Sequence, residues 1–287
     1  MVSAADRVNN PARASVWLDR RTPSRSRRSA QPTGLDRERI TAASVRLLDA
    51  EGLAKFSMRR LAAELDVTAM SLYWYVDTKD DLLELALDSV HSEIESPGEN
   101  TDWRVGLREL AASYRGLLVR HVWVSSLIGH FLNIGPHAML FAYSVQDVVR
   151  ATGLPPRQRT GALSAVFQFV YGFGTIEGHF AQHAAAAGLS QDAFFQQAMG
   201  TILAEPKLRG ALEAAQDRME ARGGDTVEEM RERDFEVALN VLIAGIETMR
   251  RDGSGFGTGT GTGTEQGRGD AQGRAQDQGQ GQAAGGR

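Results

Sequence analysis

The segment SMRRLAAELDVTAMSLYWYVDTKDDLLELAL, residues 57–87, combines short apolar repeats with residues that start helices. Ser57 can cap one helix, and Thr68, after the break at LDVT, can cap a second and much shorter one. Thr78 opens a third helix, with Asp81 three residues later as the acidic partner of a capping box. The segment therefore predicts a helix, a turn and a helix, followed at once by a further helix.

The expected short helix, 69–75, has the features of a recognition helix. In a helix-turn-helix the second helix enters the major groove of DNA, so it needs an apolar face that packs on the first helix and an exposed face of small residues. Leu72 belongs to the apolar face. The residues expected to face outward near the N-terminal end, where base edges are read, are Thr68, Ala69, Met70 and Ser71.

Three consecutive aromatic residues end this short helix. Tyr73 can press its ring on a sugar and donate its hydroxyl to a phosphate, and Trp74 and Tyr75 can do the same or wedge the helix against the next one. Lys79 lies at the N-terminus of that next helix, where its ammonium group and the first backbone N–H groups can hold another phosphate. We therefore expect all four residues to contribute to DNA binding.

A longer amphipathic segment precedes this region. Residues 35–52, LDRERITAASVRLLDAEG, repeat apolar residues near the helical spacing and stop at Gly52, a natural helix terminator. Residues 40–88 as a whole resemble the N-terminal domain of the TetR family of transcriptional regulators, from this helix through RRLAAELDV and SLYWYV to TKDDLL. The resemblance implies an all-α fold, with a three-helix helix-turn-helix DNA-binding domain over 35–95 and a C-terminal helical bundle over 100–251 for ligand binding and dimerisation.

The resemblance also assigns individual residues to the DNA interface. By position, Arg59 is similar to the arginine of the second helix that reaches a guanine edge, and operator-contacting positions are occupied by Met70, Ser71, Tyr73, Trp74 and Lys79. Ala69 departs from the tetracycline repressor, which has a glutamine at that place. Because a methyl group cannot form a bidentate hydrogen bond with adenine, the operator sequence should differ.

Charge is distributed unevenly along the chain, whose formal net charge is -4. Residues 1–34 carry seven arginines against two aspartates and have little apolar periodicity, so they are expected to form a disordered basic arm. The DNA-binding region 35–95 has 7 Lys and Arg against 13 Asp and Glu. DNA binding must therefore depend on the local placement of a few cations, and binding to nonspecific DNA should be weak. The Gly-rich residues 252–287 read as a flexible tail.

Two C-terminal segments predict a dimer interface. Residues 155–188 are apolar over most of a helical circumference, and residues 234–251 repeat large apolar side chains at helical spacing. Two such helices from each of two subunits would form a symmetric four-helix interface, as a palindromic operator requires. Completion of a monomer core by both helices is the alternative. The interface candidates are Phe235, Leu239, Leu242 and Ile246.

The resemblance to the tetracycline-repressor branch extends to 121–140, 160–178 and 234–249, and implies a ligand pocket between the C-terminal helices. A large apolar cavity with few polar groups suits an apolar or aromatic inducer. The candidate lining residues are Trp103, Leu107, Tyr114, Trp123, Phe131, Met139, Tyr143, Phe167, Phe169, Tyr171 and Phe173.

No cofactor and no metal site is expected. In the tetracycline repressor a histidine binds the magnesium ion that carries the drug, but here the corresponding place is Phe131, with His130 next to it. His179 and His183 are spaced by one helical turn, yet no third ligand stands at a defined spacing. The chain has no cysteine and shows no secretory or membrane-spanning apolar run, so a cytoplasmic location is expected.

These observations predict a homodimeric, ligand-responsive DNA-binding transcriptional regulator, and specifically a repressor that an apolar or aromatic inducer releases from a palindromic operator. A helical ligand-binding or scaffold protein that has lost operator binding is the alternative. An enzyme built on the C-terminal bundle is a remote third, because the sequence shows no clustered catalytic constellation.

Overall fold

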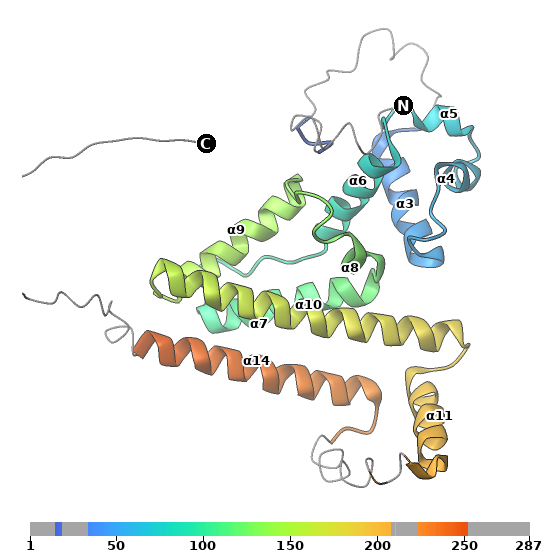
Figure 1. Cartoon of the computed structure of the whole chain (residues 1–287). Helices are drawn as coiled ribbons and strands as arrows, with labels where there is room; N and C mark the ends of the chain where they lie inside the picture. The colour runs from blue at the N-terminus through green and yellow to red at the C-terminus, as the bar shows by residue number, and fades with distance from the viewer. Residues whose placement is uncertain (1–14, 19–33, 208–209, 211–222, 252–287) are drawn as a thin grey trace, which may run out of the picture. The chain divides into compact units, whose positions relative to one another are not determined.

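The computed structural model describes residues 15–18, 34–207, 210 and 223–251, and within these ranges it contains ten α-helices and no β-strand (Figure 1). The predicted all-α class is confirmed. The predicted Gly-rich tail, 252–287, and most of the predicted basic arm lie outside the described residues. The helices are α3 (Arg37–Glu51), α4 (Met58–Glu64), α5 (Ala69–Leu72), α6 (Lys79–His91), α7 (Trp103–Arg120), α8 (Trp123–Leu127), α9 (Pro136–Ala151), α10 (Pro156–Ala186), α11 (Gln191–Ala204) and α14 (Val227–Arg251).

Local signals in the sequence fix the helix ends of the N-terminal region. Ser57 accepts a hydrogen bond from the backbone N–H of Arg60 at 3.2 Å and so caps α4. Thr78 and Asp81 form the predicted capping box at the start of α6, with reciprocal side-chain to backbone hydrogen bonds of 3.0 and 2.9 Å. Gly52 ends α3 with φ 78°, a backbone conformation that favours glycine.

The helix-turn-helix is built by α4 and α5. In the turn between them Asp66 has φ 53°, a left-handed conformation that aspartate tolerates better than most residues. Leu72 of α5 is fully buried against the other helices, as predicted. The regular helix ends at Leu72 rather than at 75, because residues 73–75 continue as turns with hydrogen bonds three residues apart. α6 ends at His91.

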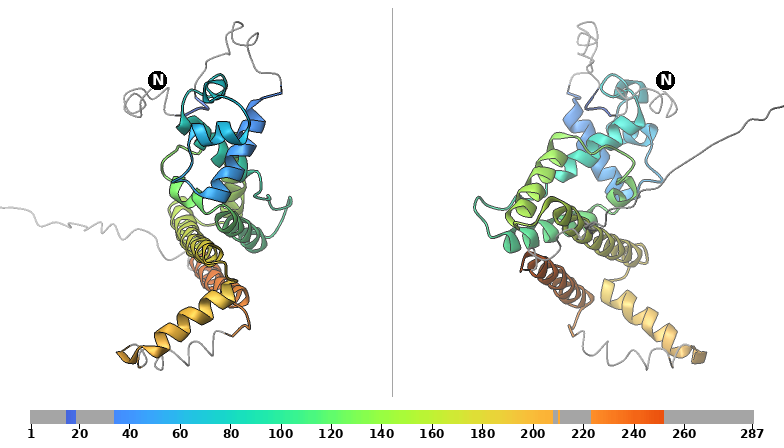
Figure 2. Two further views of the ribbon diagram at one scale, coloured as in Figure 1. Left: turned by 90° about the vertical axis from the view of Figure 1, so that its right-hand side faces the viewer. Right: turned by 60° about the vertical axis from the view of Figure 1, so that its left-hand side comes forward.

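The C-terminal part is organised around α7, α10 and α14, which run alongside one another in Figure 1 and Figure 2. Gly174 and Gly178 of α10 face α7, and a Cβ at Gly178 would lie 2.9 Å from the carbonyl oxygen of Leu118. The two helices therefore approach closely along this seam because glycine has no side chain. α11 packs against the ends of α10 and α14.

α6 connects the two regions. It packs on α3 on one side and on α9 on the other, and all but three of its residues are buried. Each fully buried leucine contributes about 1.5–3 kcal/mol of hydrophobic stabilisation, so α6 is held firmly by both neighbours. No helix in the described ranges is both long and apolar enough to cross a lipid bilayer.

Candidate nucleic-acid interface and ligand pocket

The exposed end of the helix-turn-helix contains most of the residues predicted to bind DNA. Met70 is 70% exposed, and Tyr73 and Trp74 are large aromatic side chains with more than a third of their surface exposed. A buried apolar anchor and an exposed tip on the same short element form the arrangement that reads a DNA groove. Met70 lies two residues before the buried Leu72, and Tyr73 and Trp74 follow Leu72 directly.

Two neighbouring arginines of α4 have different surroundings. Arg60 forms ion pairs with Glu51 at 2.5 Å and with Glu64 at 3.8 Å, and these carboxylates raise its pKa. Arg59 is exposed, and no carboxylate in the described part of the chain forms an ion pair with it. Arg59 is therefore the cation of α4 whose guanidinium is available to an acceptor on DNA.

The smaller residues at the start of α5 have a structural role as well. Thr68 caps the helix through the backbone N–H of Ser71 at 3.3 Å, and the two hydroxyl oxygens are 2.9 Å apart. Ala69 is half-buried and packs against the core. Lys79 is half-buried, with its Nζ 5.6 Å from the centre of the Phe56 ring, so a cation lies beside the aromatic turn.

Tyr75 does not point outward like its two neighbours. Its hydroxyl donates to the carbonyl oxygen of Leu35 at 2.6 Å, and its own carbonyl oxygen accepts from Arg37 at 3.2 Å. Its side chain packs against the core. Tyr75 therefore fixes the recognition turn (α5 with residues 73–75) to the segment before α3, which differs from the expected wedge against the next helix, and its contact with DNA stays a prediction.

A short piece of the predicted basic arm, Ser15–Leu18, rests on α6. The backbone N–H of Val16 donates to Glu84 at 2.9 Å, and the Ser15 hydroxyl donates to the same carboxylate. Val16 and Trp17 pack against the core. These four residues therefore depart from the expected disorder of the arm.

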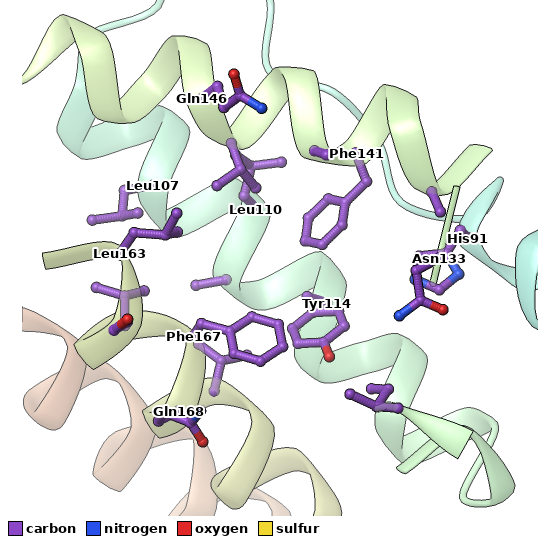
Figure 3. Close-up of a pocket in the computed structure, with 18 residues that line it drawn as sticks. His91, Leu107, Leu110, Tyr114, Asn133, Phe141, Gln146, Leu163, Phe167 and Gln168 are labelled. Atoms are coloured by element: carbon purple, nitrogen blue, oxygen red, sulfur yellow. The ribbon is translucent and has the colours of Figure 1, made fainter. Parts of the chain in front are cut away.

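The C-terminal region contains a cavity of about 440 Å³, enclosed by α6, α7, α9 and α10 (Figure 3). Its wall is mostly apolar, and no Asp, Glu, Lys or Arg side chain of the described residues lines it. The lining residues are His91, Leu107, Leu110, Ala111, Tyr114, Ile128, Asn133, Ala138, Phe141, Ala142, Val145, Gln146, Leu163, Ser164, Val166, Phe167, Gln168 and Val170.

Aromatic rings from three helices stack along the wall. Tyr114 of α7 lies between Phe141 of α9 and Phe167 of α10, with ring centroids 5.4 and 5.5 Å apart and interplanar angles of 26° and 22°. Tyr171 continues the column at 6.2 Å and 12° from Phe167. A wall of nearly parallel rings favours a flat aromatic guest, because such a guest can stack in the same orientation.

Polar groups around the cavity are neutral. The Nδ1 of His91 lies 2.7 Å from the carbonyl oxygen of Leu87, so Nδ1 carries the proton and Nε2 remains an acceptor. Burial is the largest effect on His91 and lowers its pKa, although the hydrogen bond to Leu87 and the charge of Asp88 act in the opposite direction, so the ring stays uncharged. Burial strongly raises the pKa of Tyr114, so its phenol stays protonated and can donate. With Asn133, Gln146, Ser164 and Gln168, which also line the cavity, these groups offer neutral donors and acceptors among apolar surfaces.

Three of the eleven predicted lining residues are in the wall, namely Leu107, Tyr114 and Phe167. The other eight do not line this cavity, because their helices turn them elsewhere or other partners engage them. Trp103 and Trp123 are core residues, and the Trp123 indole N–H donates to Asp49 at 2.7 Å. Tyr143 is 54% exposed. The remaining five are Phe131, Met139, Phe169, Tyr171 and Phe173.

The wall residues that the sequence reasoning missed lie mainly on α9 and α10. Ala138, Phe141, Ala142 and Val145 recur at intervals of three and four residues, which is the signal of one helix face. That signal was present in the sequence, but the predicted set favoured large aromatic residues. His91 carried no comparable signal.

The predicted interface residues of α14 are mostly internal. Phe235, Leu239 and Ile246 are each less than 5% exposed in the single chain, and Leu242 is partly buried against the same core. For Phe235, Leu239 and Ile246 the predicted contact with a second copy is therefore corrected, because other helices of the chain already cover them; for Leu242 that contact stays a prediction. The exposed apolar residues of α14 are Val237 and Val241, at 63% and 67%.

An ionic bridge joins the helix-turn-helix region to the C-terminal helices. His121, directly after α7, has Nδ1 2.7 Å from Asp49 of α3 and Nε2 2.9 Å from Glu93. Burial by itself lowers the pKa of His121, but hydrogen bonds and charge attraction from Asp49 and Glu93 outweigh burial, and the pKa is raised. Both ring nitrogens face carboxylates, so the geometry suits the imidazolium ion.

Comparison with known proteins agrees with this organisation. Residues 40–86 match the family described as "Bacterial regulatory proteins, tetR family", and residues 96–250, more than half of the chain, match "Tetracyclin repressor-like, C-terminal domain". The chain is 37% identical over 144 residues to an HTH-type transcriptional regulator of Saccharopolyspora erythraea, covering 50% of this chain and 61% of the relative. It is also 37% identical over 159 residues to the HTH-type transcriptional repressor DrrR1 of Streptomyces coeruleorubidus, covering 55% of this chain and 57% of the relative.

Solved structures resemble the chain over a longer span. The structure of the Streptomyces coelicolor TetR family protein ActR in complex with actinorhodin matches with a TM-score of 0.59 and 27% identity. The match covers 76% of this chain and 97% of that chain. The similarity therefore includes the C-terminal helices as well as the helix-turn-helix.

Proposed function

Because the chain belongs to the tetR family of bacterial regulatory proteins, we propose that it is a cytoplasmic transcriptional repressor whose homodimer binds a palindromic operator. An uncharged, planar aromatic ligand binds in the cavity and releases the operator. The observation that carries this proposal is the position of α6, which begins with Lys79 directly after the recognition turn and ends with His91 in the cavity wall. A single helix thus belongs to both sites.

The chemistry of the cavity supports the ligand class. Stacked rings favour a flat aromatic molecule, and the absence of charged side chains among the described lining residues disfavours an ionic one. The Tyr114 hydroxyl and the His91 Nε2 suit a carbonyl and a hydroxyl on the ligand. Actinorhodin, which is bound in the ActR structure, is the first compound to test here.

The proposed dimer face is on α10 and α14. Ile176, Val237 and Val241 are exposed apolar residues on these two helices, and a symmetric pairing of two copies would cover them. The dimer would place two recognition turns about 34–36 Å apart, one turn of the duplex. Ligand binding would tilt α6 and change that separation, so induction is a shift between two states.

The test begins with selection of DNA from a random pool by the purified full-length protein. A palindromic consensus bound with a salt dependence typical of specific complexes is expected. Actinorhodin affinity is then measured by calorimetry with and without saturating operator. By reciprocity, a ligand that weakens operator binding must itself bind less tightly to the operator complex, by the same factor.

The possible results separate the two functions that the sequence left open. Enrichment of no sequence would favour the ligand-binding or scaffold alternative. Selection of an operator together with equal actinorhodin affinities in both titrations would show that this ligand does not drive release. A panel of flat aromatic compounds would then be titrated in the same way. If none of them bound with a different affinity in the presence of operator, the proposed mechanism of induction would be wrong.

A further inference from the structure

Asp88 of α6 is a buried carboxylate that is directed at the start of another helix. It is only 4% exposed. The backbone N–H of Ala138 in α9 donates to its Oδ1 at 2.9 Å, and the N–H of His137 lies 3.5 Å from its Oδ2. The negative charge is therefore placed at the positive end of the α9 dipole, where anions are stabilised.

α9 has no cap of its own. Its N-cap position is Gly135, which has no side chain to accept a hydrogen bond, and Pro136 follows at the first helical position. The first turn of a helix leaves backbone N–H groups without partners inside the helix. Here α6 supplies the acceptor, so the cap comes from a residue 50 positions away from Ala138 in the sequence.

The glycine at 135 matches this arrangement sterically. A Cβ at Gly135 would lie 2.2 Å from Oδ1 and 2.3 Å from Cγ of Asp88, so any larger residue would push the carboxylate away. Gly135 has φ -65°, which every residue adopts easily. The need for glycine is therefore set by the approach of Asp88 and not by backbone conformation.

Asp88 is also close to the ligand cavity. His91, one turn further along α6, lines the cavity, and so do Ala138 and Phe141 of α9. Figure 3 shows His91 at the edge of the cavity beside the end of α9 that carries Phe141. The carboxylate thus joins the helix that forms one wall of the cavity to the helix that leads to the recognition turn.

From this geometry we propose that Asp88 is the positioning residue that makes α6 follow α9 when the cavity is filled. Separation of the two helices would leave a buried carboxylate and the backbone N–H groups of His137 and Ala138 without these partners, which is costly. A guest that displaces α9 therefore moves α6 as well, and the recognition turn with it. This inference rests on the proposed function, because it describes how that function is regulated.

The test uses hydrogen–deuterium exchange of full-length protein, free and bound to its selected operator. In the natural chain, operator binding should change the exchange rates of the first turn of α9, 136–139, by about fivefold or more, the lower end of ordinary coupling between sites. In Asp88→Ala this change should disappear while the changes in α4 and α5 remain. Asp88→Asn should keep it, because asparagine is also a good cap.

Two further variants complete the design. In Gly135→Ala, as in Asp88→Ala, operator binding should no longer change exchange in the first turn of α9. The Asp88 carboxylate is still present in this variant, but the new methyl group displaces it. Asp147→Ala removes an exposed acid near the other end of α9 and should behave like the natural chain. The proposal would be overturned if operator binding changed the exchange rates at the start of α9 equally in Asp88→Ala and in the natural chain.

A second arm needs no DNA, so failure of the link and failure of the proposed function are distinguishable. In the free proteins, Gly135→Ala should accelerate exchange in the last turn of α6 around 88–91 as well as at the start of α9. If exchange became faster only in α9, the proposed coupling of α6 to α9 through Asp88 would be overturned, whatever the result with DNA. Selection of no operator would instead count against the proposed function alone.

Discussion

Replacing His121 with glutamine should destabilise the protein most strongly at mildly acidic pH. In the natural chain the imidazolium ion bridges Asp49 and Glu93, which come from different parts of the structure. Glutamine is neutral at every pH and cannot donate to both carboxylates in the same geometry. The variant therefore removes the charge and one hydrogen bond while it keeps a polar side chain of similar length.

The size of the effect follows from the two hydrogen bonds. A hydrogen bond to a charged group contributes about 1.5–3 kcal/mol, but the carboxylate side chains are 32% and 38% exposed, so solvent screens both interactions. Asp49 also keeps its hydrogen bond from Trp123 in the variant. We therefore expect a loss of about 2 kcal/mol in the free energy of unfolding.

The sign of the pH dependence comes from the raised pKa of His121. A group with a higher pKa in the folded state stabilises the protein fully below its unfolded pKa of about 6.5. That contribution disappears as the pH rises through the higher pKa of the folded protein. The difference between the natural chain and His121→Gln should thus be largest below about pH 6.5 and become smaller as the pH rises above it.

The measurement is urea unfolding followed by far-ultraviolet circular dichroism across this pH range. The matched control is His130→Gln, because His130 is an exposed histidine nearby in the sequence. A difference between His121→Gln and the natural chain that stays constant with pH would refute an imidazolium bridge. If His130→Gln showed the same pH trend, the pH dependence could not be assigned to His121.

Four further changes test the remaining features. Arg59→Ala should weaken operator binding by about 1–3 kcal/mol and relax preference at one base pair per half-site, whereas an equal loss on nonspecific DNA would assign Arg59 to phosphate contact. Replacement of the seven arginines of residues 1–34 by glutamine, which leaves Ser15–Leu18 in place on α6, should flatten the salt dependence of binding in filter or anisotropy titrations, and identical salt slopes would show that the arm does not contact DNA. Phe167→Ala widens the cavity and Phe167→Trp narrows it, so both should alter the ligand concentration needed for release, while unchanged release curves would exclude Phe167 from the site. Arg115→Met leaves the buried Glu177 without its two hydrogen bonds of 2.7 and 3.0 Å and should cost about 3–5 kcal/mol in urea unfolding, whereas a loss below about 1 kcal/mol would show that the pair contributes little.

The helix-turn-helix could be predicted closely from sequence because its signals are local. Ser57 and Thr78 cap helices through backbone groups only three residues away, and Gly52 ends a helix by its own conformation. Tyr75 was assigned less well. Its partner, the carbonyl oxygen of Leu35, is 40 residues away, and no local pattern reveals that contact.

The cavity was harder to predict because it depends on how each helix is rotated. Phe167 lines the cavity, but Phe169 packs instead on Phe235 of α14, with ring centroids 5.3 Å apart. Two residues along a helix are separated by about 200° around its axis, so aromatic residues close in sequence point in different directions. The same reasoning explains α14, where Phe235 is internal and Val237 is exposed.

The glycine seam between α10 and α7 has a consequence for which molecules the cavity can accept. Gly174 and Gly178 bring the two helix backbones together, and neither helix can approach further or slide without a clash. The walls formed by α7 and α10 therefore act as a fixed frame, and extra room for a larger ligand must come from α9 and α6. The size of the ligand along the direction from α10 to α9, rather than its total volume, then limits which molecules can bind.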